Sequence, residues 1–459
     1  MLGRVRVISA LLAGAATMLG SGPVMAQSLA DALAKAYQTS PELAAQRASV
    51  KVASESAAIA RSGGRLTVTG TASIELQTER DDQFNLPTAL NLSIVQPIYT
   101  GGQVENSTSA AERRISGAES VLTAVEQDVL FAAATAFLDV RQDEALVRVA
   151  RNNVKVLSEQ LEAAEERFEV GEVTRTDVEQ ARARLAAARS SLAASLGSLE
   201  NSRDAYRRAI GEAPRKLAPP PPLPDLPRTE QDAAIIALQN EPDLQAVRIE
   251  REASGFDVKT AIGALLPQVS LQGNLNQSNI VDDGFDGSRS AALGLFVTIP
   301  FYSGGSNYAA VRQAQADVEG ADANITAAMR DVRQAVGIAW SALDVARAQI
   351  KAGRLEVRAA ELAFEGVREE AKVGARTTLD VLDAEQETLE ARAGLITAQR
   401  DEYVSAYQLL QSMGLLTVEH LGLDVGLEPD TAAYYDSVRN RTFGYDQSDD
   451  TVWSLDWRP

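Results

Sequence analysis

The chain has 459 residues, a formal charge of −19, one histidine and no cysteine. This length suits two or three ordinary domains or one elongated repeat. The acidic balance argues against a nucleic-acid partner, because phosphate contacts require clustered lysine and arginine. The lack of cysteine excludes disulfides, thiolate metal sites and thiol catalysis. His420 has no cluster of partner residues, so we expect a surface side chain and neither a metal site nor a cofactor.

The first 26 residues have the composition of a secretory signal. Two arginines precede an apolar run over residues 7–19, and a small-residue cleavage site ends at Ala26. Cleavage there would leave a charge of −21, because the signal contains two arginines and no acid. The remaining chain has no apolar run of about 18 residues, so we expect no membrane helix. These features predict an exported bacterial protein.

The first half of the exported chain, residues 27–213, predicts long helices and two strands. The strands are indicated where the hydrophobic period changes from 3.6 to 2. The longest helix has an apolar seam typical of a coiled coil and would span about 100 Å at 1.5 Å per residue. The predicted elements are helices at about 29–62, 102–169 and 174–210, and strands at about 65–79 and 88–99.

The second half, residues 231–416, repeats this pattern. Matching motifs lie 203 positions apart, so we interpret the chain as a duplicated strand, strand, long helix, turn, helix unit of mixed α and β class. A proline-rich segment, residues 214–230, joins the repeats as an extended linker. Residues 417–459 form an acidic tail, which we expect to be loosely ordered after residue 425. The predicted elements are helices at about 231–263, 305–372 and 377–413, and strands at about 267–279 and 290–302.

Each repeat contains a helical hairpin with the same turn. A glycine that can end one helix is followed by Thr-x-x-Asp, a capping box that can start the next. The second copy adds Arg376, and it has Asp383 where the first copy has Gln180. The shared hairpin residues are Gly171, Thr174 and Asp177 in the first repeat and Gly374, Thr377 and Asp380 in the second.

Each second strand ends in the same motif, Pro-x-Tyr-x-Gly-Gly. The two copies lie 203 residues apart and mark the connection from strand to long helix. They consist of Pro97, Tyr99, Gly101 and Gly102 in the first repeat and of Pro300, Tyr302, Gly304 and Gly305 in the second.

The four predicted strands suit a transmembrane barrel that one chain cannot close. The smallest single-chain barrels have eight strands, and an open edge in lipid would leave backbone groups unpaired. Further copies of the chain would therefore complete the barrel, although a small soluble sheet packed on helices remains an alternative. Residues 30–62 and 175–209 together match the long helix in length, which predicts two short helices stacked end to end beside it.

The chain resembles the TolC family of outer-membrane efflux and secretion ducts. The resemblance rests on the two Pro-x-Tyr-x-Gly-Gly motifs and on residues 167–171 and 373–383, and it extends to about residue 416. It implies a homotrimer with a twelve-stranded barrel in outer-membrane lipid and a helical coiled-coil tunnel across the periplasm of a Gram-negative bacterium. It also implies two partners, a periplasmic adaptor protein and an inner-membrane pump of RND or ABC type.

The resemblance also implies a gate at the periplasmic tip. Asp380 and Asp383 would line the aperture, where three copies form a ring that attracts cations. Arg376 would contact Thr176 and Asp177 as a latch. Asp177 and Asp380 are also expected to cap helix N-termini. The best-known members have a tyrosine near position 371, where this chain has alanine, so its latch is expected to be weaker or built differently.

The predicted function is a passive exit duct rather than an enzyme, because the sequence shows neither a phosphate-binding loop nor a catalytic cluster. One alternative is an exported structural coiled-coil protein without a pore, although such a spacer has no use for amphipathic strands. A second is type I protein secretion instead of small-molecule efflux, which uses the same kind of duct.

Overall fold

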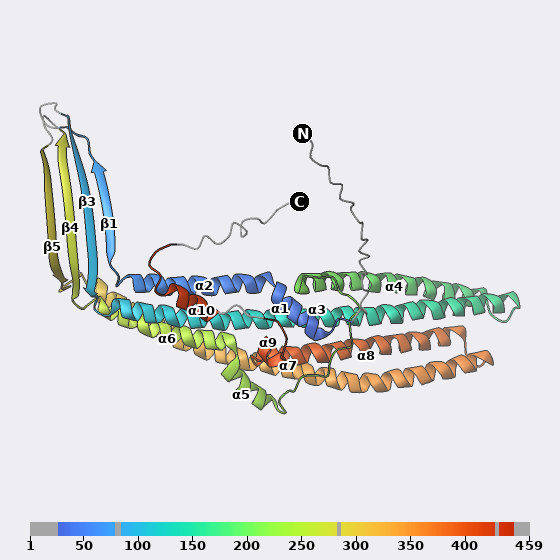
Figure 1. Cartoon of the computed structure of the whole chain (residues 1–459). Helices are drawn as coiled ribbons and strands as arrows, with labels where there is room; N and C mark the ends of the chain where they lie inside the picture. Colours follow the sequence, from blue (N-terminus) through green and yellow to red (C-terminus); the bar gives the residue numbers. More distant parts are fainter. Residues whose placement is uncertain (1–25, 79–83, 282–285, 427–430, 445–459) are drawn as a thin grey trace, which may run out of the picture.

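The structure is a computed structural model that describes residues 26–78, 84–281, 286–426 and 431–444. A small sheet forms one end of an elongated molecule, and bundled long helices form the rest (Figure 1). Nearly all of the expected signal, apart from Ala26, lies outside the described residues.

The sheet is antiparallel and combines strands from both repeats. Its order is β1-β3-β4-β5, and the short β2 also pairs with β3. The β3–β4 pair joins the two halves of the chain, with Leu92 opposite Leu275. Strands β1 and β5 lie at the two edges, as an incomplete barrel requires. The strands are β1 (Thr67–Ile74), β2 (Gln77–Thr78), β3 (Phe84–Tyr99), β4 (Gln268–Val281) and β5 (Asp286–Thr298).

Each repeat contributes one helix of 67 residues and several shorter ones. The helices of the first repeat are α1 (Leu29–Thr39), α2 (Pro41–Ser62), α3 (Gln103–Glu169) and α4 (Arg175–Ile210). Those that follow are α5 (Glu230–Asn240), α6 (Pro242–Gly263), α7 (Ser306–Lys372), α8 (Thr378–Ser412), α9 (Val418–Leu421) and α10 (Thr431–Val438).

The sequence predicted one continuous helix over residues 29–62 and another over 231–263, but each of them is broken into two helices. Both helices break before a proline, which lacks an N–H group and disfavours helical geometry in the preceding residue. Ser40 has extended backbone angles, and its side chain accepts a hydrogen bond from the N–H of Leu43 at 3.2 Å. Glu241 caps α6 in the same way, through the N–H of Leu244 at 2.6 Å.

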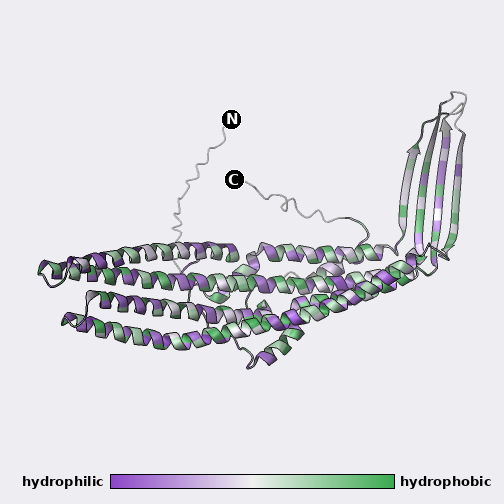
Figure 2. Ribbon diagram, turned by 180° about the vertical axis from the view of Figure 1, so that it is seen from behind, coloured by the Kyte–Doolittle hydropathy of each residue, from purple (hydrophilic) through white to green (hydrophobic). Residues whose placement is uncertain are grey.

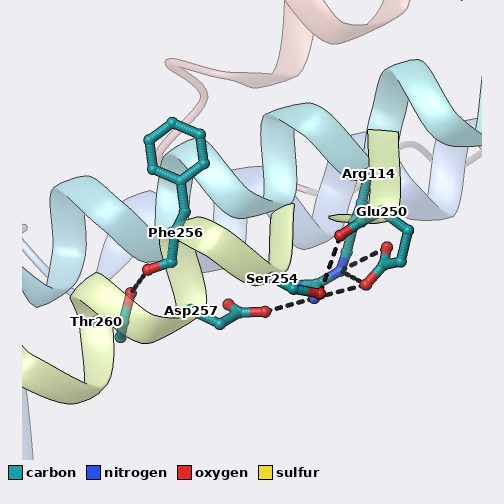
Figure 3. A network of polar contacts seen from close by, with 6 residues as sticks. All are labelled: Arg114, Glu250, Ser254, Phe256, Asp257 and Thr260. Atoms are coloured by element: carbon teal, nitrogen blue, oxygen red, sulfur yellow. Dashed lines mark hydrogen bonds and ion pairs between the residues drawn. The ribbon is translucent and has the colours of Figure 1, made fainter. Parts of the chain in front are cut away.

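The short helices stack end to end beside the long ones. Helices α2 and α4 both pack against α3, and α6 and α8 both pack against α7, in agreement with the prediction from helix lengths (Figure 1). Helix α6 also packs on α3. There Arg114 pairs with Glu250 at 3.0 Å and with Asp257 at 2.6 Å (Figure 3). The two repeats are therefore joined along their helices as well as through the sheet.

The main core lies where the short helices break. Large buried side chains from both repeats meet there, including Phe137, Tyr206, Leu343 and Leu410. Among the described helices, α3 alone is long and apolar enough to cross a membrane by length and composition. Its Phe137 is part of this core, so packing accounts for apolar side chains of α3. Apolar and polar residues intermingle along all the long helices (Figure 2).

Part of the C-terminal tail packs against the helices. Tyr434 donates its hydroxyl to Glu55 at 2.9 Å, and Tyr435 donates to Glu112 at 2.6 Å. Arg65 donates to the carbonyl of Arg439 at 2.8 Å. The expectation of a loosely ordered tail is therefore wrong for residues 431–444.

Candidate functional site

Two hairpin turns form the end of the molecule farthest from the sheet (Figure 1). Gly171 and Gly374 both have a φ of 79°, in the left-handed region that only glycine enters without strain. The N–H of Gly171 donates to Phe168 at 3.0 Å, and that of Gly374 donates to Ala371 at 3.1 Å. Each hairpin therefore turns at its glycine.

Both predicted capping boxes form at these turns. The hydroxyl of Thr377 donates to Asp380 at 2.8 Å, and the N–H of Asp380 donates back to that hydroxyl at 3.2 Å. Thr174 and Asp177 repeat this arrangement. Hydrogen bonds from the N–H and then the hydroxyl of Thr377 lower the pKa of Asp380. The Asp380 carboxylate therefore starts α8, and it is ionised at neutral pH.

Arg376 does not make the expected contacts within one chain. Its Nε donates to Glu370 at 2.9 Å, across its own turn. Thr176 is exposed on the other hairpin, and the Asp177 carboxylate accepts hydrogen bonds from Thr174. Within one chain Arg376 therefore pairs with Glu370, and the latch to Thr176 and Asp177 stays a prediction.

Asp383 joins the two hairpins. Its Oδ1 lies 2.6 Å from Nη2 of Arg184, on α4 of the first repeat. The sequence reasoning missed Arg184. The sequence did contain a signal for Arg184. Its equivalent in the second repeat, 203 residues later, is Glu387, so the two repeats differ in charge at this position, as they also do at Gln180 and Asp383.

Buried residues lie directly beneath this ion pair. Leu382 is 2% exposed and packs with Leu157 and Leu185, so α8 is held against the first hairpin. Glu385 is 8% exposed. Burial, and then repulsion from Glu159, raise the pKa of Glu385 to about 7. A buried carboxyl group therefore titrates near neutral pH beside the tip.

Exposed apolar side chains stand at both turns. Val170 is 72% exposed and Val373 is 81% exposed, at equivalent positions of the two repeats. The tip therefore offers apolar contacts as well as charges.

The opposite end of the helices connects to the sheet through paired glycines. Gly102 and Gly305 precede α3 and α7 with φ values of 80° and 87°. Gly101 also has a positive φ, and a Cβ placed on it would lie 2.4 Å from the carbonyl oxygen of Gly263. Paired glycines therefore precede the long helix in both repeats, and the first connection is tightly packed.

The second connection differs from the prediction. Strand β5 ends at Thr298, so Pro300 and Tyr302 lie outside the sheet. Because Pro300 has no N–H, it cannot donate a hydrogen bond to a neighbouring strand, and β5 pairs with β4 alone, so the strand ends before this residue. Pro97, in contrast, lies in β3 at a shift of the β3–β4 register, which accommodates it.

His420 is exposed in α9, and its backbone N–H donates to the hydroxyl of Thr417. Within the described ranges there is no group of three or more histidine or acidic side chains with the spacing of a metal site.

An open sheet of five strands, one of them only two residues long, joined to helices of 67 residues is the architecture of a class of protein, the envelope-spanning channel whose barrel is completed by further copies. The sequence model of the family described as "Outer membrane efflux protein" matches residues 32–212 and 235–415. Each repeat matches it separately, with starts 203 residues apart. The chain belongs to this family.

The individual relatives agree with the family match. The chain is 33% identical to outer membrane efflux protein BepC of Brucella suis over 437 residues, which cover 95% of each protein. It is 26% identical to outer membrane protein TolC of Vibrio cholerae, over 89% of this chain and 95% of TolC. A crystal structure of CusC superimposes with a TM-score of 0.75 at 18% identity, over 85% of this chain and 92% of CusC.

These findings confirm the resemblance, the fold class and the location drawn from the sequence. The chain is an outer-membrane exit duct for efflux in a Gram-negative bacterium and extends into the periplasm. Its fold is that of the trimeric channels, in which three chains close one barrel of strands above a helical tunnel.

Proposed function

We propose that the two hairpin tips form a gated aperture at the periplasmic end of a passive duct. Three copies would bring Asp380 and Asp383 around one axis, with six carboxylates in a narrow ring. Such a ring attracts cations and repels anions. The ion pair between Asp383 and Arg184 carries this proposal. It joins a carboxylate of the ring, on one hairpin, to an arginine on the other hairpin, so the contact breaks when the hairpins move apart.

The exposed tip would bind the partners that open the duct. Val170 and Val373 would contact a periplasmic adaptor, and the energy for transport would come from an inner-membrane pump of RND or ABC type. The chain itself would act as a conduit and not as an enzyme. In the trimer, Arg376 would leave Glu370 and contact Thr176 or Asp177 of a neighbouring copy. The ion pair between Arg376 and Glu370 is exposed, so breaking it costs little free energy.

Block by multivalent cations tests the proposed ring. The trimer is reconstituted into a planar bilayer, and hexamminecobalt(III) is added to the periplasmic side. Block is expected for the wild type and is expected to disappear in D380A/D383A. D401A serves as the control, because Asp401 lies on the same helix far from the tip and pairs with Arg400. Equal block in the wild type and D380A/D383A would place the cation site elsewhere.

A further inference from the structure

A groove rich in arginine runs between α3 and α8, beside the linker between the repeats. It has a volume of about 750 Å³. Although the chain has a net charge of −19, five arginines and one carboxylate line this cavity. Its five arginines are Arg141 and Arg148 from α3, Arg354 from α7, and Arg392 and Arg400 from α8.

Three of these arginines have partners within the chain. Arg400 pairs with Asp139 at 2.6 Å. Arg392 pairs with Glu361 at 2.7 Å. Arg141 donates to two carbonyl groups of the linker, one of them that of Leu217 at 3.2 Å. These contacts hold the walls of the groove in place.

The other two arginines are different. Arg148 and Arg354 are exposed, and neither makes an ion pair or a hydrogen bond with any other residue in the described part of the chain. In this cavity of about 750 Å³ the one lining carboxylate, Glu402, lies 3.6 Å from Arg347, whereas Glu361, Glu365 and Glu385 line the cavity that adjoins it. The groove therefore presents two guanidinium groups with open hydrogen-bonding positions, the geometry that binds carboxylates.

The groove is elongated. It meets a second cavity of about 380 Å³ that shares Val149, Asn152 and Arg392 with it. The lining residues of α3 extend from Leu138 to Val156, which corresponds to about 27 Å along the helix. A space of this length suits a peptide segment better than a single small anion.

The second cavity also contains polar atoms that lack partners. Nε of Arg368 and Oε2 of Glu385 are buried there without a hydrogen bond. Apolar side chains, including Leu138 and Ile396, line the first cavity beside the arginines. The continuous groove therefore offers charged, polar and apolar contacts in sequence, as a peptide-binding surface does.

The linker shows which side of the duct the groove faces. Tyr403, which lines the groove, donates its hydroxyl to the carbonyl of Pro221 at 2.9 Å, so the linker crosses this face. The interior of a duct must stay clear of a crossing segment. The groove therefore opens on the outer, periplasmic side, an argument that rests on the proposed function.

We propose that this arginine groove binds an acidic peptide segment of a periplasmic protein. Carboxylates of the segment pair with Arg148 and Arg354, and its apolar side chains contact the floor of the groove. An extended segment of six residues spans about 20 Å and fits within the length of the groove.

Binding of hexaglutamate tests this proposal. Fluorescein-labelled hexaglutamate is titrated with the detergent-solubilised trimer at low salt, and fluorescence anisotropy is measured. Binding is expected for the wild type, and R148Q/R354Q is expected to weaken it about tenfold through the loss of two charge pairs. The matched control is R189Q/R358Q, which removes two exposed arginines outside the groove.

Three results would overturn the proposal. They are no binding to the wild type, equal weakening in both double variants, and competition by citrate as strong as that by unlabelled hexaglutamate at equal carboxylate concentration. The last would assign the groove to small anions. Single-channel conductance is measured on the same preparations and is expected to be unchanged in R148Q/R354Q. A failure of peptide binding is thereby distinguished from a failure of the duct.

Discussion

Asp383 and Arg184 lie 199 residues apart in the sequence and form an ion pair of 2.6 Å that connects the two hairpins. Both side chains are about half exposed, so one pair contributes little free energy, about 0.2–1 kcal/mol. Three pairs in a trimer would act together on the same opening. The contact therefore suits a closed state that is easily released.

Charge reversal tests whether this pair holds the tip closed. R184D and D383R are each expected to raise the conductance of the trimer in planar bilayers, because like charges then face each other between the hairpins. The double variant R184D/D383R restores the attraction and is expected to return conductance toward the wild-type value. If the double variant conducts as much as the more open single variant, the pair does not hold the tip.

The sequence predicted the elements of this tip better than its contacts. Gly171, Gly374 and the two Thr-x-x-Asp boxes determine local backbone geometry, so their roles could be read from spacing alone. The partner of Asp383 depends on how α4 and α8 pack, which no local pattern encodes. The burial of Glu385 depends on the same packing.

Residues outside the repeats were the least predictable. The acidic composition after residue 425 favoured a loosely ordered tail, yet Tyr434 and Tyr435 donate hydrogen bonds to carboxylates on α2 and α3. Hydrogen bonds of this kind need the folded helices as a template. Pro41 gave a clear local signal for a break, but the helical periodicity on both sides of it favoured one continuous helix.

Tyr435 is expected to hold α10 against the helices. Its hydroxyl donates to Glu112, and burial together with this bond raises its pKa to about 12, so it remains a donor at physiological pH. Y435F should speed tryptic cleavage after Arg439 and Arg441 about fivefold, from the loss of a hydrogen bond to a charged group. The control is Y308F, at a tyrosine that is 61% exposed. Equal cleavage rates for Y435F and wild type would show that other contacts retain α10.

Gly101 is expected to tolerate substitution much less well than Gly304. Both have similar positive φ values, 65° and 64°, so alanine strains the backbone of either by about 1–2 kcal/mol. A Cβ on Gly101 would also meet the carbonyl of Gly263 at 2.4 Å, whereas a Cβ on Gly304 would meet no atom within 4 Å in the described chain. G101A should therefore lower the thermal unfolding midpoint more than G304A. Similar midpoints would mean that α6 moves away at little cost.

Glu385 is expected to make stability depend on pH near neutrality. Its pKa is about 7 in the folded chain against 4.5 in a model peptide, so the folded state binds the proton more tightly. Stability from this group is complete below about pH 4.5 and is lost as pH rises through 7. At about 1.4 kcal/mol for each pKa unit, the full effect on the free energy of unfolding is roughly 3 kcal/mol.

Replacing the carboxyl group by an amide should remove this dependence. E385Q is expected to be more stable than the wild type at pH 8 and similar to it at pH 5, as measured by thermal unfolding in detergent. E387Q is the control, because Glu387 is exposed on the same helix. A difference between E385Q and wild type that is the same at both pH values would contradict titration of Glu385 in this range.

Since Leu382, one turn away, packs against the first hairpin, the charged form of Glu385 should also loosen the contact between the hairpins. The conductance of the wild type, but not that of E385Q, should therefore rise between pH 6 and pH 8.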